Sequence, residues 1–179
     1  MSTPTGASRA ETSLLIAFAD LTRFMRESAR RSDLQLAEVL DGFYARVAAR
    51  VNAAGGRVVK FIGDAAFVVF PEDRADEGVR ALLGLREEID RWIREEHGWE
   101  SRLVVKLHFG TAVAGPFGPP GEAFLDVVGR AVNVAATLPS QGFALSAPAF
   151  RKLAPETRRR FKRHVPPITY VPVDETRPR

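Results

Sequence analysis

The fold is decided by two apolar runs that flank a tight turn, RVVKFIGDAAFVVF at residues 57–70. Gly63 and Asp64 separate the runs, and both residue types favour turns between strands. The segment therefore predicts a β-hairpin with strands over 57–62 and 65–70. Pro71 ends the second strand, because proline cannot donate a hydrogen bond to a neighbouring strand.

The segment before this hairpin predicts a strand and two helices. The apolar run LLIAFA at residues 14–19 is typical of a central strand, which ends at Asp20. Residues 1–12 are rich in Ser, Thr, Gly and Pro and predict a flexible leader. Residues from 21 to about 28 predict a short helix, and Asp33 is the expected N-cap of a longer one.

The segment after the hairpin mixes helices and strands. Residues 74–96 carry an apolar stripe at helical spacing, which predicts a long helix. Residues 110–121 are rich in Gly and Pro and predict a loop or a long protruding turn. The other expected elements are strands over 103–109, 124–128 and 143–146, helices over 131–138 and from Pro148, and at most one edge strand in the tail. This order predicts an α+β fold, with helices packed on a mostly antiparallel sheet.

Composition indicates a single globular domain over residues 13–179, with a basic, Pro-containing tail. Hydrophobic residues make up 45% of the 179 residues and charged residues 27%, which excludes a mainly disordered chain. Cysteine is absent, so disulfides and thiolate chemistry are excluded. No apolar run reaches the roughly 20 residues of a spanning helix. We therefore expect a cytoplasmic protein without a membrane partner.

The net charge of +4 is weak support for nucleic-acid binding. Much of the excess lies in one local stretch near the end of the chain, RRRFKR at residues 158–163. A basic face spread over the whole fold would be the stronger signal. We expect no nucleic-acid partner.

Asp20 and Asp64 are candidate metal ligands. Each lies at the end of an apolar strand, so rigid elements hold both carboxylates at sheet ends. Two neighbouring anions repel unless a cation lies between them, and carboxylate oxygens are preferred ligands of Mg²⁺. The alternative is that Asp20 caps the following helix and Asp64 suits the turn. Spacing alone leaves both interpretations open.

Lys60 stands in the middle of an apolar strand. With Val58 and Ile62 it is expected to share one face of the hairpin, where an ammonium group needs an acceptor or an outlet to water. The alternative is an edge lysine that discourages pairing with other strands.

Four segments together resemble the catalytic domain of class III nucleotidyl cyclases. They are FADLTRF at 18–24, GRVVKFIGD at 56–64, GTAVAG at 110–115 and LDVVGRAVNVAA at 125–136. Their order and separations match the family over residues 14 to about 150. The resemblance implies a ferredoxin-like core and a head-to-tail homodimer, or a pair with a heterologous cyclase-like partner, with active sites at the interface.

The resemblance also implies roles for single residues. Two Mg²⁺ or Mn²⁺ ions would be held by Asp20, Asp64 and Leu21. The triphosphate would be cradled by backbone N–H groups of three residues, Thr22, Arg23 and Phe24.

The partner chain would recognise the base and the ribose. Lys60 and Asp126 suit adenine, because lysine can donate to N1 and a carboxylate can accept from the exocyclic amine. Asn133 would position the ribose. The implied reaction is attack of the ribose 3′ oxygen of ATP on the α-phosphorus, which yields 3′,5′-cyclic AMP and pyrophosphate.

Two positions depart from the family pattern. Thr137 stands where an arginine usually follows the asparagine, and Val104 stands where another arginine usually precedes the glycine segment. Arg102, Lys106 and Arg130 are possible compensating cations, and each is otherwise a solvated surface charge. The alternative function is therefore a weak or inactive cyclase-like module that binds a nucleotide or regulates a partner.

Overall fold

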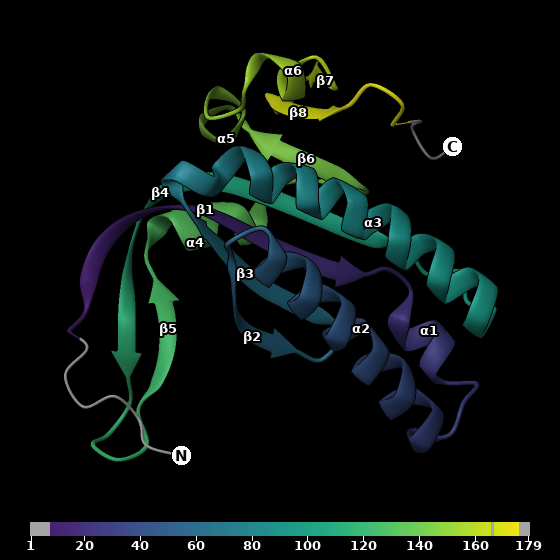
Figure 1. The fold of residues 1–179 in the computed structure, drawn as a ribbon. Coiled ribbons are helices and arrows are strands. Elements are labelled where there is room, and N and C mark those ends of the chain that lie inside the picture. The colour runs from purple at the N-terminus through teal and green to yellow at the C-terminus, as the bar shows by residue number, and fades with distance from the viewer. Residues whose placement is uncertain (1–7, 166, 176–179) are drawn as a thin grey trace.

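Strands and helices follow one another along the chain as Figure 1 shows, in a computed structural model that describes residues 8–165 and 167–175. The strands are β1 (Ala10–Leu21), β2 (Arg57–Ile62), β3 (Ala65–Pro71), β4 (Leu103–Phe117), β5 (Phe124–Val128), β6 (Phe143–Ser146), β7 (Phe161–His164) and β8 (Thr169–Pro172). The helices are α1 (Phe24–Ser28), α2 (Asp33–Ala53), α3 (Ala75–His97), α4 (Arg130–Thr137), α5 (Ala147–Arg151) and α6 (Pro155–Arg158), with a 3₁₀ turn η1 (Glu72–Arg74).

The strands form one mostly antiparallel sheet, as predicted. Seven of them lie in the order β2-β3-β1-β4-β6-β8-β7, and β5 pairs with β4 beside this path. Among the described strands, only the β4–β6 pair is parallel. β1 is central, because it pairs with β3 on one side and with β4 along its whole length on the other.

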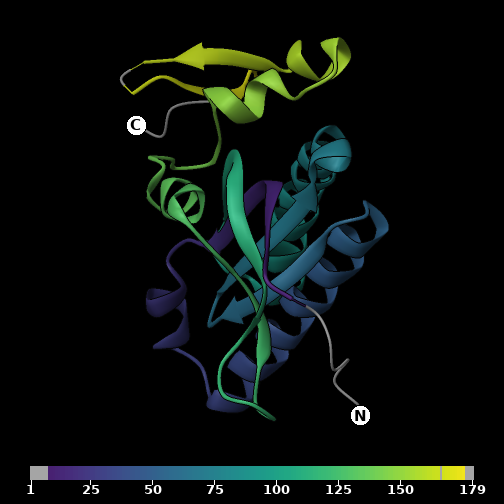
Figure 2. The same ribbon diagram turned by 90° about the vertical axis from the view of Figure 1, so that its left-hand side faces the viewer.

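Helices cover both faces of the sheet (Figure 2). α2 and α3 pack on one face over the main core, to which β1 contributes Leu15 and Ala17. α4 packs on the opposite face over a smaller cluster that includes Leu14 and Ile16. Successive side chains of a strand point to opposite faces. Asp20 therefore projects on the α4 side of the sheet.

The long helices confirm the expected periodicity, with small shifts at their ends. Ser32, and not Asp33, caps α2, because the Ser32 hydroxyl accepts from the Gln35 N–H at 3.3 Å. The Gln35 side chain accepts in turn from the Ser32 N–H at 3.0 Å, which completes a capping box. No helix in the described ranges has the length and apolar character needed to cross a membrane.

Two predictions, on the start of β1 and on the end of β4, are wrong. β1 begins at Ala10, so residues 10–12 belong to a strand that pairs with β4 and not to a leader. Residues 1–7 of the predicted leader lie outside the described residues. The predicted loop over 110–121 is largely strand, because β4 continues to Phe117 and pairs with β1 and β5 there. β4 and β5 project together from the sheet as a hairpin (Figure 1).

The C-terminal region has more regular structure than predicted. A second helix, α6, follows α5, and two strands replace the single edge strand expected in the tail. β8 pairs with both β6 and β7. These short backbone ladders join residues 161–164 and 169–172 to the sheet.

Candidate functional site

Asp20 and Asp64 come together at one end of the sheet. β1 and β3 pair so that Asp20 lies opposite Ala65, the residue after Asp64. The Leu21 N–H also donates to the carbonyl oxygen of Asp64 at 3.2 Å, which joins the end of β1 to the turn between β2 and β3. The strand register therefore brings Asp20 and Asp64 to the same end of the sheet, and their role as metal ligands stays a prediction.

The pKa values of both carboxyl groups are raised, and the charge of Asp64 contributes to the shift of Asp20. Partial burial raises the pKa of Asp20, and the negative charge of Asp64 raises it further. The Lys106 ammonium and a backbone hydrogen bond from Leu21 act in the opposite direction. Burial also raises the pKa of Asp64, although a backbone hydrogen bond opposes the shift. A cation bound between the two groups would relieve this repulsion.

The carboxylate pair fits a divalent metal that also binds substrate. Within residues 8–165 and 167–175, no group of three or more His, Cys, Asp or Glu side chains could hold a metal ion. Two carboxylates suit Mg²⁺ or Mn²⁺, which can complete their shells with water and phosphate oxygens. The Leu21 side chain is apolar and only 2% exposed, so only its backbone could join such a site.

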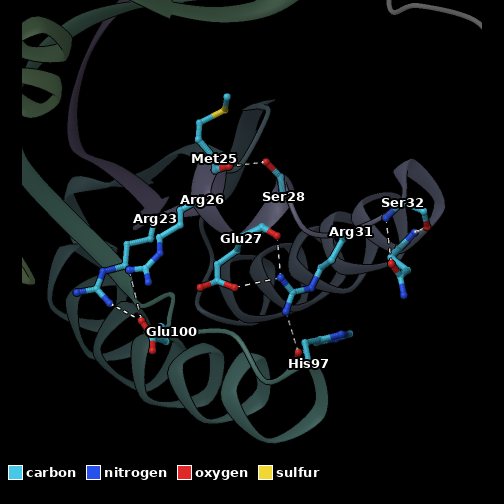
Figure 3. A network of polar contacts seen from close by, with 10 residues as sticks. Arg23, Met25, Arg26, Glu27, Ser28, Arg31, Ser32, His97 and Glu100 are labelled. Carbon is cyan, nitrogen blue, oxygen red and sulfur yellow. Dashed lines mark hydrogen bonds and ion pairs between the residues drawn. The ribbon is translucent and has the colours of Figure 1, made fainter.

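The segment between β1 and α1 is held in a strained turn. Arg23 has φ 59° and ψ 14°, the left-handed region that non-glycine residues rarely adopt. The Thr22 N–H donates to the Arg102 carbonyl at 2.9 Å, and the Thr22 hydroxyl accepts from the Arg102 N–H at 3.0 Å. Figure 3 shows Arg23 and Arg26 directed at Glu100, with 2.8 Å between Arg23 and the carboxylate.

These contacts change the prediction for the phosphate-binding segment. The Thr22 N–H is bonded to the Arg102 carbonyl, so its contact with a triphosphate stays a prediction that requires this bond to break. The N–H groups of Arg23 and Phe24 have no acceptor among the described residues. The Phe24 ring packs against Trp99, with 5.7 Å between centroids. Sequence reasoning missed Glu100, because an exposed acidic residue outside any motif carries no signal.

Lys60 and Asp126 form an ion pair within the chain. Lys60 Nζ lies 2.6 Å from Asp126 Oδ2, and Asp126 Oδ1 accepts from the Val127 N–H at 2.8 Å. The Lys60 side chain is 40% exposed and that of Asp126 only 13%. The Phe124 ring lies 6.0 Å from the ammonium. The two predicted base-reading groups are therefore adjacent, and Lys60 remains open to solvent.

A β-bulge in β2 directs Lys60 toward this partner. The register with β3 shifts between Val58 and Lys60. Val58 and Phe61 both pack against the main core, although residues three apart in a regular strand point to opposite faces. The prediction that Val58, Lys60 and Ile62 share one face is therefore wrong. β2 is an edge strand, as the alternative for Lys60 required.

α4 presents Asn133 and Thr137 one turn apart, and both are exposed. The Thr137 hydroxyl donates to the backbone carbonyl of Asn133 at 2.7 Å. Its hydrogen is therefore used within the helix and cannot replace the donors of an arginine. The Asn133 side chain has no hydrogen-bond partner in the described part of the chain.

The three candidate cations occupy different surroundings. Arg102 precedes β4, and it lines a cavity of about 480 Å³ together with Arg86 and Asp90 of α3. It therefore lies on the α3 side, and the prediction that it shares a face with Val104 is wrong. Arg130 is the exposed first residue of α4. Lys106 is partly buried within β4 and interacts electrostatically with Asp20.

Solved cyclase structures have this fold. The adenylyl cyclase CyaB from P. aeruginosa matches with a TM-score of 0.79 and 18% identity, over 95% of this chain and 98% of that one. The guanylyl cyclase Cya2 matches with a TM-score of 0.77 and 18% identity, over 90% of this chain and 91% of that one. The predicted α+β fold of class III nucleotidyl cyclases is confirmed.

The chain belongs to the family of adenylate and guanylate cyclase catalytic domains, whose family model matches residues 7–147. Adenylate cyclase 2 of Rhizobium meliloti is 30% identical over 151 residues, which cover 77% of this chain and 41% of that protein. The chain thus spans about two fifths of the length of this curated relative. Adenylyl and guanylyl cyclases share this fold, so the fold alone does not indicate a nucleotide.

Proposed function

We propose that this domain is an adenylate cyclase, which converts ATP to 3′,5′-cyclic AMP and pyrophosphate at a dimer interface. The observation that carries the proposal is the Lys60–Asp126 pair, with 2.6 Å between the charged atoms. A lysine can donate to adenine N1 while a carboxylate accepts from the exocyclic amine. Guanine in the same pose would place its N1 hydrogen opposite the lysine and its O6 acceptor opposite the carboxylate, so the pair would be poorly matched to it.

The proposed assembly is a head-to-tail homodimer, with a heterologous cyclase-like partner as the alternative. One chain contributes the carboxylate pair, and the other contributes Lys60, Asp126 and Asn133. Exposed apolar side chains next to these residues support an interface there. Ile62 is 54% exposed, Phe124 57% and Val134 42%.

In this mechanism the chain mainly positions the nucleotide. Asn133 orients the ribose so that its 3′ oxygen faces the α-phosphorus, and the free N–H groups of Arg23 and Phe24 bind phosphate oxygens. Asp20, Asp64 and the Leu21 backbone would hold two Mg²⁺ or Mn²⁺ ions, which would lower the pKa of the 3′ hydroxyl and neutralise phosphate charge. A bond forms from the 3′ oxygen to the α-phosphorus, the bond to the bridging oxygen breaks, pyrophosphate leaves, and the hydroxyl proton passes to solvent.

A second candidate is a weak or inactive module that binds nucleotide and regulates a partner. Thr137 and Val104 favour it, because both stand where the resemblance places arginines. The Thr137 hydroxyl is bonded within α4, and Val104 is apolar and 7% exposed. Loss of one hydrogen-bond donor that stabilises the negative charge of the transition state lowers the rate on the order of 10²-fold.

A turnover assay separates the two candidates. Purified protein at concentrations that give dimer is incubated with ATP and Mn²⁺, and cyclic AMP and pyrophosphate are measured. We expect activity in the wild type and in Asp41→Ala, a control that removes an exposed carboxylate from α2. Asp20→Ala is expected to be inactive. Wild-type turnover no higher than that of Asp20→Ala would overturn the cyclase proposal and support the regulatory module.

A further inference from the structure

Lys106 is a diagonal neighbour of Asp20 on the sheet. β1 and β4 pair with Phe18 opposite Lys106 and Asp20 opposite Val104. Residues that face each other across antiparallel strands point to the same side, as do alternate residues along one strand. Asp20 and Lys106 therefore project from the same face. Diagonal neighbours lie about 7–8 Å apart, within reach of a long side chain.

The Lys106 ammonium also reaches the end of α4. Its Nζ lies 3.3 Å from the carbonyl oxygen of Ala136, the residue before Thr137. Along β4, Lys106 is two residues from Val104 and on the same face. Within one chain, Lys106 thus lies beside position 104 and is held in place by the end of α4.

Lys106 is a cation without a carboxylate partner. Lys60 pairs with Asp126 and Lys152 pairs with Glu72. None of the ion pairs within the described ranges includes Lys106, which contacts only a backbone carbonyl. Withdrawing an ammonium partly from water carries a cost that an anionic partner would offset.

Asp20, Asp64 and Lys106 together define the kind of ligand that could bind to all three. Asp20 and Asp64 suit divalent cations, whereas a protonated lysine has no lone pair and cannot ligate a metal. A ligand that satisfies both must be an anion that binds the metals and the ammonium at once. Phosphate oxygens of a nucleotide meet this requirement.

We propose that Lys106 is the side chain that binds the phosphate chain of the nucleotide beside Asp20 of the same chain and supplies the cation that position 104 lacks. The inference rests on the proposed function. Arg102 cannot serve, because it lies on the α3 side with Asp90. Arg130 lies at the opposite end of α4 from Ala136. Lys106 is the cation that β4 itself places next to the carboxylate pair.

The test uses two substitutions at this position and one control. Lys106→Met keeps the length of the side chain and removes the charge, whereas Lys106→Arg keeps the charge. Lys152→Met is the control, because it removes a lysine that directly follows α5 and pairs with Glu72. Binding of 3′-deoxy-ATP with Mn²⁺ is measured by calorimetry, since this analogue lacks the attacking oxygen. Cyclic AMP formation and the thermal unfolding midpoint are measured in parallel.

Lys106→Met is expected to weaken 3′-deoxy-ATP binding by about tenfold or more, the value of a charge-assisted hydrogen bond. It should lower kcat/KM for ATP on the order of 10²-fold. Lys106→Arg should restore most of both, and Lys152→Met should change neither. Equal affinity of wild type and Lys106→Met overturns the inference, as does a loss that Lys106→Arg leaves unrestored.

The binding assay separates this inference from the proposed function. Lys106-dependent binding without cyclic AMP formation by the wild type would support the inference and overturn the cyclase proposal. Full cyclase activity in Lys106→Met would do the reverse. A wild-type protein that binds no 3′-deoxy-ATP would overturn both.

Discussion

Removing the charge of Lys60 or of Asp126 should destabilise the fold by an amount set by their burial. Exposed ion pairs contribute about 0–1 kcal/mol, whereas breaking a buried pair costs about 3–5 kcal/mol. Lys60 is 40% exposed and Asp126 13%, so solvent screens the pair only in part. We expect Lys60→Met to lower the free energy of unfolding by about 1–2 kcal/mol, between these limits.

A double-mutant cycle measures this interaction directly. Urea unfolding is followed for the wild type, Lys60→Met, Asp126→Asn and the double variant, and the coupling energy is expected to be about 1 kcal/mol. Asp126→Asn keeps an oxygen for the Val127 N–H, so the cycle isolates the charge interaction. Strictly additive losses would refute the proposed strength of the pair.

The same pair is expected to set the choice of nucleotide. Lys60→Glu replaces the donor to adenine N1 by an acceptor, so the preference for ATP over GTP should fall by about tenfold or more, the value of one charge-assisted hydrogen bond. The ratio of kcat/KM for the two nucleotides is measured with Mn²⁺. Unchanged discrimination would refute the assignment of the base site.

Three further substitutions test other parts of the structure. Thr137→Arg should raise the rate of cyclic AMP formation about tenfold, because it adds a cation one turn after the asparagine; an unchanged rate would count against this role. Arg23→Gly should raise the free energy of unfolding by about 0.5–1 kcal/mol, since glycine adopts φ 59° without strain. Urea unfolding measures this change, and a lower free energy of unfolding would contradict the prediction. Burial lowers the pKa of His108, so its contribution to stability is complete above the unfolded pKa of 6.5 and is lost as pH falls through the folded value. Relative to His108→Asn, the wild type should therefore lose stability between pH 7 and pH 5, and parallel pH profiles would contradict this.

Much of the fold could be predicted because its signals are local. The hairpin over residues 57–70 and the long helix α3 are visible in the spacing of apolar residues. β4 beyond Phe109 could not be predicted in this way, because glycines and a proline interrupt its pattern. Its pairing with β1 and β5 supplies the backbone hydrogen bonds that local propensity does not indicate.

The candidate site could be predicted in its residue types but only in part in its arrangement. Asp20, Asp64, Lys60 and Asp126 are motif residues, and two of them form the ion pair that the proposed base site needs. Thr22 lies in the predicted phosphate-binding segment, yet its N–H is bonded to a residue 80 positions away. No sequence pattern reports a hydrogen bond between such distant segments.

The sequence by itself determined the class of the fold and the kinds of charge at each motif, because apolar periodicity and turn residues act over a few neighbouring positions. Only the tertiary structure decided which charges meet. The bulge in β2 directs Lys60 to Asp126, and the register of β1 with β4 places Lys106 diagonal to Asp20. Both depend on how separate strands align, and a shift of one residue would turn each side chain to the other face of the sheet.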